Sequence, residues 1–233
     1  MWRTSRSRSA RLRARRPTTR RPTNRRGCGG ARSGQATRVL ALDIGGVVYR
    51  SWPDQALYER WAPAFGCSAQ ALQAHLWGPH WAAAELGEIT KETCYETAGA
   101  NLGVSAALVR DLIFEAFASQ PDEALASCVV RLRQRGVVVT ALTNNPSPEA
   151  ELLARPELVR LFDLAITSAD AHLTKPDPAF YRHAEARLRA AGADIVFVDD
   201  MLENIDAALR LGWSGVHFQS TDQAIEEIES ALA

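Results

Sequence analysis

The stretch Val39-Leu40-Ala41-Leu42-Asp43-Ile44-Gly45-Gly46-Val47-Val48 decides the fold of this chain. Its apolar start predicts a buried strand, and the carboxylate and two glycines that follow predict a turn. A strand that ends in this way points the carboxylate of Asp43 out of the edge of a sheet. Open α/β sheets bind their ligands at that edge. We therefore expect a functional site there, with Asp43 in it.

The second half of the chain alternates short apolar runs with helical patterns. Such alternation indicates a parallel sheet that helices cover on both faces. Glycines such as Gly136, Gly192 and Gly212 separate the helices from the strands that follow them. The predicted strands are Val137–Leu142, Leu164–Thr167, Ile195–Val198 and Val216–Phe218, and the predicted helices among them are Pro178–Ala191 and Leu202–Leu211, before a last amphipathic helix.

The region between the first strand and about residue 120 has no convincing strand pattern. Ser68, Thr90 and Ser105 are plausible N-caps, because their side chains can accept from the first free amides of a helix. This region therefore predicts a small helical bundle, inserted after the first strand. Its expected helices are Asp54–Ala64, Ala69–Leu76, Thr90–Leu102 and Ser105–Ser119.

Three further polar segments follow the first in an informative order. They are Leu142–Asn145, Lys175–Pro178 and Val196–Asp200, and two of them end apolar runs. With Asp43–Val47 they resemble the four signature motifs of the haloacid dehalogenase superfamily, and in particular its helical-cap, phosphatase-like members. The resemblance covers about residues 38–233.

That resemblance implies an α/β fold, namely a doubly wound, Rossmann-like parallel sheet with an inserted helical cap. The core would comprise residues 38–51 and 121–233, and the cap residues 52–120. Most members hydrolyse phosphate esters through an aspartyl intermediate. The function we expect is therefore a magnesium-dependent phosphatase that acts on a small phosphorylated metabolite, as a monomer or homodimer.

The resemblance also implies roles for the residues that carry chemistry. Asp43 would be the nucleophile and a ligand of Mg²⁺. Thr143 would bind the phosphoryl group with help from Asn144, and hydroxyls at a strand end can hold an oxygen where charge develops. Lys175 would bind substrate and neutralise both the nucleophile and the phosphoryl group. It is one of two lysines in a chain with 27 basic residues, which favours a specific role.

The remaining predicted metal ligands are oxygen donors, which magnesium prefers. Asp200 would be a direct ligand and Asp199 a direct or water-mediated one, while Gly45 would contribute its backbone carbonyl. Asn204 lies four residues beyond Asp200 and would orient this loop. In the inserted bundle, Trp77, His80 and Trp81 either face the site or pack between helices.

Gly45 is the main departure from the superfamily pattern, in which a second aspartate stands at this position. That carboxylate normally protonates the leaving group, and acid–base catalysis of this kind contributes roughly 10²–10⁴-fold. Two alternatives therefore stay open beside the phosphatase. One is a 2-haloacid dehalogenase, whose members also lack this aspartate. The other is a catalytically weakened binding protein on the same fold.

Composition is strongly asymmetric along the chain. Residues 1–38 contain 13 Arg and no acidic residue, whereas all 27 Asp and Glu follow. The segment 1–37 predicts a disordered, Arg-rich tail, since it has almost no large apolar side chain to bury. We interpret it as a solvated extension. A basic arm can bind nucleic acid and an acid-free, Arg- and Ser-rich N-terminus can resemble an organelle transit peptide, but we favour neither, and we do not expect nucleic acid as a partner.

The cysteines and the hydropathy indicate the expected compartment. Cys28, Cys67, Cys94 and Cys128 show no CxxC spacing, which argues against a zinc site and against a disulfide framework. No apolar stretch approaches the length of roughly 18–20 residues that spans a bilayer. We therefore expect a cytoplasmic protein without a membrane segment.

Overall fold

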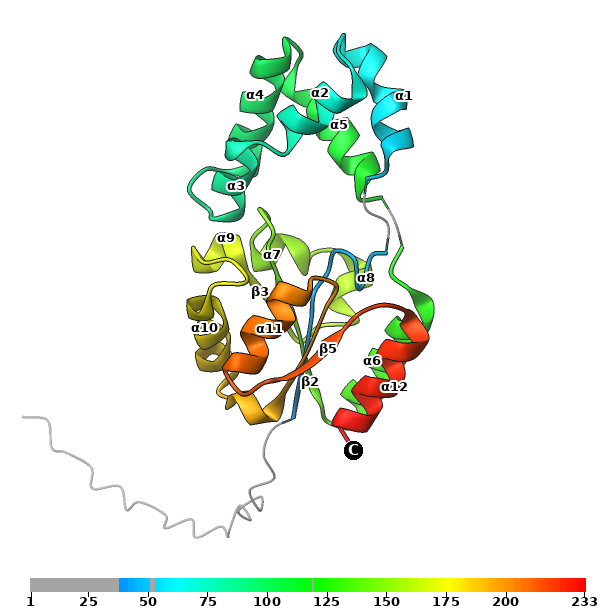
Figure 1. Ribbon diagram of the computed structural model, residues 1–233, viewed down its shortest axis with the longest axis vertical. Helices are drawn as coiled ribbons and strands as arrows, with labels where there is room; N and C mark the ends of the chain where they lie inside the picture. Colours follow the sequence, from blue (N-terminus) through cyan, green and yellow to red (C-terminus); the bar gives the residue numbers. More distant parts are fainter. Residues whose placement is uncertain (1–37, 51–52, 119) are drawn as a thin grey trace, which may run out of the picture. The chain divides into compact units, whose positions relative to one another are not determined.

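The computed structural model of the protein describes residues 38–50, 53–118 and 120–233 (Figure 1). These residues belong to one compact unit. The Arg-rich tail predicted over residues 1–37 lies outside the described residues, as does Cys28.

The core of the fold is a five-stranded sheet in the order β3-β2-β1-β4-β5. Every pairing in it is parallel, and Leu42 of β1 lies in register with Ala141 of β2 and Val198 of β4. The carboxyl ends of the three central strands therefore meet at one edge. The strands are β1 (Val39–Leu42), β2 (Val138–Thr143), β3 (Leu164–Thr167), β4 (Ile195–Asp199) and β5 (Ser214–His217).

Helices cover both faces of this sheet. Successive strand residues point to opposite sides, so the apolar strands present side chains to a helix layer on each face. Leu40 and Leu42 pack in one apolar cluster with side chains of α6 (Glu123–Gln134) and α12 (Thr221–Ala231). Val39 and Ala41 pack in another with side chains of α10 (Pro178–Leu188) and α11 (Leu202–Arg210), and Figure 1 shows the two helix layers. The predicted α/β, doubly wound architecture is confirmed.

The inserted helical region has an apolar cluster of its own, which includes Leu72, Leu76 and Leu112. Ser68, Thr90 and Ser105 accept from helix amides as predicted, and Asp54 does the same. The helices are α1 (Gln55–Phe65), α2 (Ala69–Leu76), α3 (Pro79–Glu85), α4 (Lys91–Leu102) and α5 (Ala106–Ala116).

Sequence patterns missed the short elements, because one or two helical turns show too little apolar periodicity to be recognised. These are α3 in the inserted region, then α7 (Glu149–Leu152), α8 (Pro156–Val159), α9 (Ser168–Ala171) and the 3₁₀ turn η1 (Gly192–Asp194). Strand β5 begins two residues earlier than predicted, because Gly215 is not a residue typical of strands and the apolar pattern begins only after it. A Cβ at Gly215 would lie 2.8 Å from Cγ2 of Ile205, so the strand needs glycine to approach α11.

Cys67, Cys94 and Cys128 are free thiols. None of the helices in the described ranges combines the length and the apolar character that a membrane crossing requires.

Candidate active site

Asp43 lies at the carboxyl end of the central strand, as predicted. Its backbone amide donates to the carbonyl of Val198 at 2.9 Å, which extends the pairing of β1 with β4 by one residue. Its Oδ1 accepts from the amide of Ile44 at 2.7 Å. The residue is 8% exposed, so its carboxylate is fixed at the sheet edge in a largely desolvated position.

Lys175 connects this carboxylate to a second one. Its Nζ lies 3.0 Å from Oδ1 of Asp43 and 2.6 Å from Oδ2 of Asp199. The Lys175 side chain is 2% exposed and that of Asp199 is fully buried. These two ion pairs join the ends of strands β1 and β4 to the loop before α10.

Burial and charge act in opposite directions on these groups. Burial raises the pKa of Asp43 to about 6, with a contribution from the charge of Asp199, while Lys175 limits the rise. Burial by itself would lower the pKa of Lys175, but the carboxylates of Asp43 and Asp199 outweigh it and raise that pKa. Lys175 therefore remains a cation at neutral pH.

Asn144 holds the backbone of Lys175 rather than facing the site freely. Its Nδ2 donates to the Lys175 carbonyl at 3.0 Å, and its Oδ1 accepts from the Lys175 amide at 2.8 Å. This reciprocal pair positions the lysine against Asp43. The adjacent loop is held by Ser168, whose hydroxyl accepts from the amide of Asn145 at 2.9 Å.

Asp199 is tied down by three donors. Besides Lys175 on Oδ2, its Oδ1 accepts from the Met201 amide at 2.8 Å and from Nδ2 of Asn204 at 2.9 Å. Asn204 thus orients the loop after β4, and Tyr181 donates to the carbonyl of Asn204 at 2.9 Å. Neither Ser168 nor Tyr181 gave a sequence signal, since each acts through another residue.

Asp200 completes a cluster of three carboxylates. Asp43, Asp199 and Asp200 each offer an oxygen within 4.8 Å of the others, which is a donor set of the kind that magnesium prefers. Gly46 makes room for Asp200: its φ is +76°, and a Cβ there would lie 2.2 Å from Oδ2 of Asp200. Gly45 is not among the glycines with positive φ, so its backbone conformation is not one that only glycine tolerates.

The predicted residues open into one large pocket, of about 1130 Å³. Asp199 lies behind it, fully buried. The pocket also includes side chains of the inserted helices, among them Trp77, Trp81 and Glu85, whereas His80 is not part of its described lining. From the core it is lined by Asp43, Gly45, Thr143, Asn144, Lys175, Asp200 and Asn204.

Sequence reasoning missed Glu85, because it lies on the unpredicted helix α3. Its Oε1 accepts from Nε1 of Trp81 at 3.0 Å. Burial raises the pKa of Glu85, while the hydrogen bond from Trp81 and the charge of Lys175 limit the rise.

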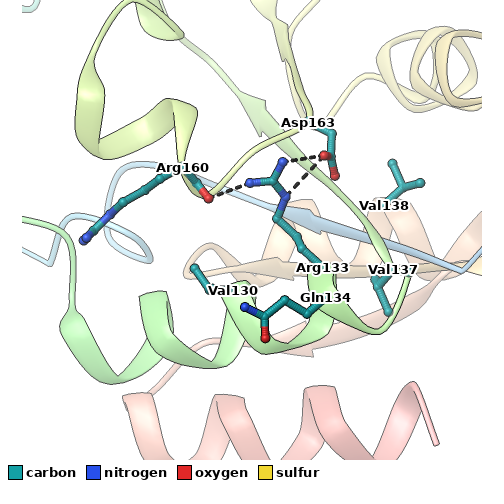
Figure 2. Close-up of a pocket in the computed structure, with 8 residues that line it drawn as sticks. Val130, Arg133, Gln134, Val137, Val138, Arg160 and Asp163 are labelled. Carbon is teal, nitrogen blue, oxygen red and sulfur yellow. Dashed lines mark hydrogen bonds and ion pairs between the residues drawn. The ribbon is translucent and has the colours of Figure 1, made fainter.

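A second pocket, of about 470 Å³, lies at the start of β2 and not at its end (Figure 2). There Arg133 donates from Nε and Nη2 to Oδ1 of Asp163, at 3.2 and 2.5 Å, and from Nη1 to the carbonyl of Arg160 at 2.5 Å. The other oxygen of Asp163 accepts from the Val139 amide at 2.9 Å. These contacts satisfy one another, and none of the four motifs contributes a residue to this pocket.

Comparisons with known proteins identify the family to which this fold belongs. The family model of haloacid dehalogenase-like hydrolases matches residues 37–212. A sesquiterpene phosphatase of Aspergillus oryzae is 32% identical over 59% of this chain and 71% of its own length. A phosphoglycolate phosphatase of Pectobacterium atrosepticum is 28% identical over 78% of this chain and 80% of its own.

Other similar proteins are longer or more distant. A drimenol cyclase of Aspergillus calidoustus is 28% identical over 82% of this chain, which spans 36% of the cyclase. The crystal structure of a HAD family enzyme from Bacteroides thetaiotaomicron, in complex with magnesium and inorganic phosphate, matches with a TM-score of 0.67 at 18% identity. The match covers 80% of this chain and 96% of that one, and it shows the shared fold.

Proposed function

This chain belongs to the family of haloacid dehalogenase-like hydrolases, and from that premise we propose that it is a magnesium-dependent phosphatase of a small phosphorylated metabolite. One observation carries the proposal. A buried carboxylate, Asp43, is held at the sheet edge beside a buried ammonium, Lys175, with further carboxylates next to it and a large pocket in front. The phosphatases among the similar proteins support it.

In the proposed reaction Asp43 attacks phosphorus, and the bond to the leaving oxygen breaks. Water then hydrolyses the aspartyl phosphate, so that one difficult displacement becomes two easier ones. Lys175 neutralises charge on the nucleophile and on the transferring phosphoryl group. Thr143 ends the neighbouring strand and lines the same pocket, where its hydroxyl can donate to a phosphoryl oxygen.

Magnesium would be held by Asp43, Asp200 and the carbonyl of Gly45. When bound, it would supply positive charge to the phosphoryl oxygens. Both oxygens of Asp199 accept from other groups of the protein, so we propose that Asp199 acts by positioning Lys175 and Asn204, with at most a water-mediated role toward the metal.

We further propose that the substrate carries an apolar body behind its phosphate. Trp77 and Trp81 pack edge to face, at 4.5 Å between ring centroids, and their indole N–H groups bond Tyr58 and Glu85. They therefore present apolar surface to the pocket. Two exposed apolar side chains, Phe114 at 78% and Met201 at 49%, lie on its wall as well. Apolar surface at a pocket favours an apolar ligand.

The carboxylate pair Asp199-Asp200 favours the phosphatase over the dehalogenase, which attacks carbon and needs no metal. The test is a screen of phosphate monoesters of increasing alkyl length, together with a 2-haloacid, each with magnesium and with excess chelator. We expect phosphate release that magnesium supports, that chelation abolishes, and whose kcat/KM rises with alkyl length. Full turnover in chelator, or release of halide, would contradict the proposal.

A further inference from the structure

The proposed reaction lacks a visible proton donor, and the inference that follows rests on that proposed function. An alkoxide is a poor leaving group unless an acid protonates it as the bond to phosphorus breaks. Position 45, two residues after the nucleophile, is a glycine and offers no acid. A donor must therefore come from another element that reaches the pocket.

Glu85 is a carboxyl group in the right place. It lies at the last position of α3 and lines the pocket together with Asp43 and Gly45. The hydrogen bond from Trp81, four residues earlier on the same helix, fixes its Oε1. When the group is neutral, its proton is therefore carried by Oε2.

The end of α3 is held against the core, so that Glu85 is not a loosely placed surface residue. Nδ1 of His172 lies 2.7 Å from the carbonyl of Leu86, the residue after Glu85. Gly87 follows with a φ of +67°, and a Cβ there would lie 2.2 Å from the carbonyl oxygen of Ala169 in α9. This approach of two backbones requires glycine. A few residues on, Lys91 forms an ion pair with Glu151 of the core.

The electrostatic surroundings suit a group that gains and loses a proton. Burial disfavours the charged form of Glu85, while the hydrogen bond from Trp81 and the charge of Lys175, which lines the same pocket, favour it. Among the described residues, the thiol of Cys94 is also affected by the charge of Glu85: burial together with Glu85 raises its pKa to about 11, so Cys94 stays neutral.

The other carboxyl groups of the pocket are worse candidates. Glu151 pairs with Lys91, and Glu157 pairs with Arg155, 2.9 Å from Nε to Oε1. Glu92 and Glu96 line the pocket but are exposed to solvent.

We propose that Glu85, supplied by the inserted helices, is the general acid that replaces the carboxyl group missing at Gly45. As Asp43 attacks and the ester bond to phosphorus breaks, Oε2 of Glu85 gives its proton to the leaving oxygen. The resulting carboxylate of Glu85 then takes a proton from the water molecule whose oxygen attacks the phosphorus of the aspartyl phosphate. This attack releases phosphate, frees the carboxylate of Asp43 and leaves Glu85 protonated again.

The test compares Glu85→Gln with Glu88→Gln, which removes an exposed carboxyl group three residues away. The amide oxygen introduced by Glu85→Gln can still accept from Trp81, so the fold should persist, as circular dichroism can verify. The measurement is kcat/KM, which reports the step up to departure of the leaving group, with an alkyl phosphate and with 4-nitrophenyl phosphate. For Glu85→Gln we expect a loss of about 10²-fold with the alkyl ester and less than about threefold with the aryl ester. Glu88→Gln should match the wild type.

A second variant keeps the inference falsifiable. Adding Gly45→Asp to Glu85→Gln should restore alkyl ester turnover, since the backbone at position 45 has no positive φ. Equal losses for both esters, or no loss for either, would overturn the role of Glu85 while leaving the phosphatase intact. A wild-type protein that hydrolyses neither ester would instead refute the proposed function.

Discussion

At each end of the parallel strands, the amino edge and the carboxyl edge of the sheet, a basic side chain pairs with carboxylate, but the two pairs differ in burial and in charge balance. At the amino edge, Arg133 is partly exposed, and its guanidinium is matched by Asp163 and the carbonyl of Arg160. At the carboxyl edge, Lys175 is buried and faces Asp43 and Asp199, with Asp200 beside them.

This difference indicates that the carboxyl edge, and not the amino edge, is the part of the sheet where charge lowers the stability of the fold. The amino edge is balanced, since the guanidinium of Arg133 and the carboxylate of Asp163 both have protein partners, and the cluster fastens α6 to the loop before β3. The carboxyl edge gathers three carboxylates around one ammonium in a place with little water. Such excess negative charge is costly in a protein that needs only to fold, and it is what the proposed metal site requires, where a bound cation would in turn attract the phosphoryl group.

Asp43→Asn should give the largest separation of activity from stability. Turnover should fall on the order of 10⁴-fold or more, the scale of losses seen when a nucleophile is removed. Stability should change little, because the variant removes a buried charge but also one partner of Lys175. Phosphate release and thermal unfolding measure the two effects. Residual turnover of a tenth or more would place the nucleophile elsewhere.

Lys175→Ala should damage both properties. It leaves two carboxylates buried without their cation, so the free energy of unfolding should fall by about 3–5 kcal/mol. Turnover should fall by about 10²–10³-fold with the loss of charge stabilisation. The matched control is Lys91→Ala, the other lysine of the chain, whose partly exposed pair with Glu151 should contribute at most about 1 kcal/mol. Similar losses of stability in the two variants would contradict the contrast between a buried and a surface pair.

The variants Gly46→Ala and Gly136→Ala compare the effect of a backbone substitution at the carboxyl edge with the effect of the same substitution at the amino edge. Both glycines have positive φ, +76° and +88°, so each alanine should cost about 1–2 kcal/mol in unfolding free energy. At Gly136 nothing lies within 4 Å of the added Cβ, whereas at Gly46 it meets Asp200. The magnesium concentration for half-maximal activity should therefore rise by about 10–100-fold in Gly46→Ala alone. An equal rise in Gly136→Ala would show that backbone strain, and not the contact with Asp200, is responsible.

Arg133→Ala should have the smallest effect on function. It removes charge-assisted hydrogen bonds at the amino edge, so we expect a loss of about 1–3 kcal/mol in urea unfolding and unchanged kcat/KM. A fall in kcat/KM at temperatures where the variant is folded would mean that the two edges are coupled.

Much of the fold followed from local patterns. The predicted strand at Leu164–Thr167 and helix at Ala69–Leu76 have the observed bounds. The strand is a short apolar run that is buried almost throughout, and an N-cap at Ser68 marks the start of the helix. The four single-turn elements and α3 could not be found in this way, because packing against their neighbours, and not their own sequence, stabilises them.

The sequence by itself determined which residues meet at the carboxyl edge. In a parallel sheet the ends of neighbouring strands coincide, so polar residues placed after apolar runs, such as Asp43, Thr143 and Asp199, must come together once the strand order is set. Only the tertiary structure decided which contacts each of them makes there. In the folded protein, Asp199 is buried and bonded to Lys175 and Asn204, and both polar atoms of the Asn144 side chain bond the backbone of Lys175. Gly46, and not Gly45, has the left-handed backbone conformation. Glu85 lines the pocket. These outcomes depend on hydrogen bonds and ion pairs between segments far apart in the chain, which no local pattern of residues encodes.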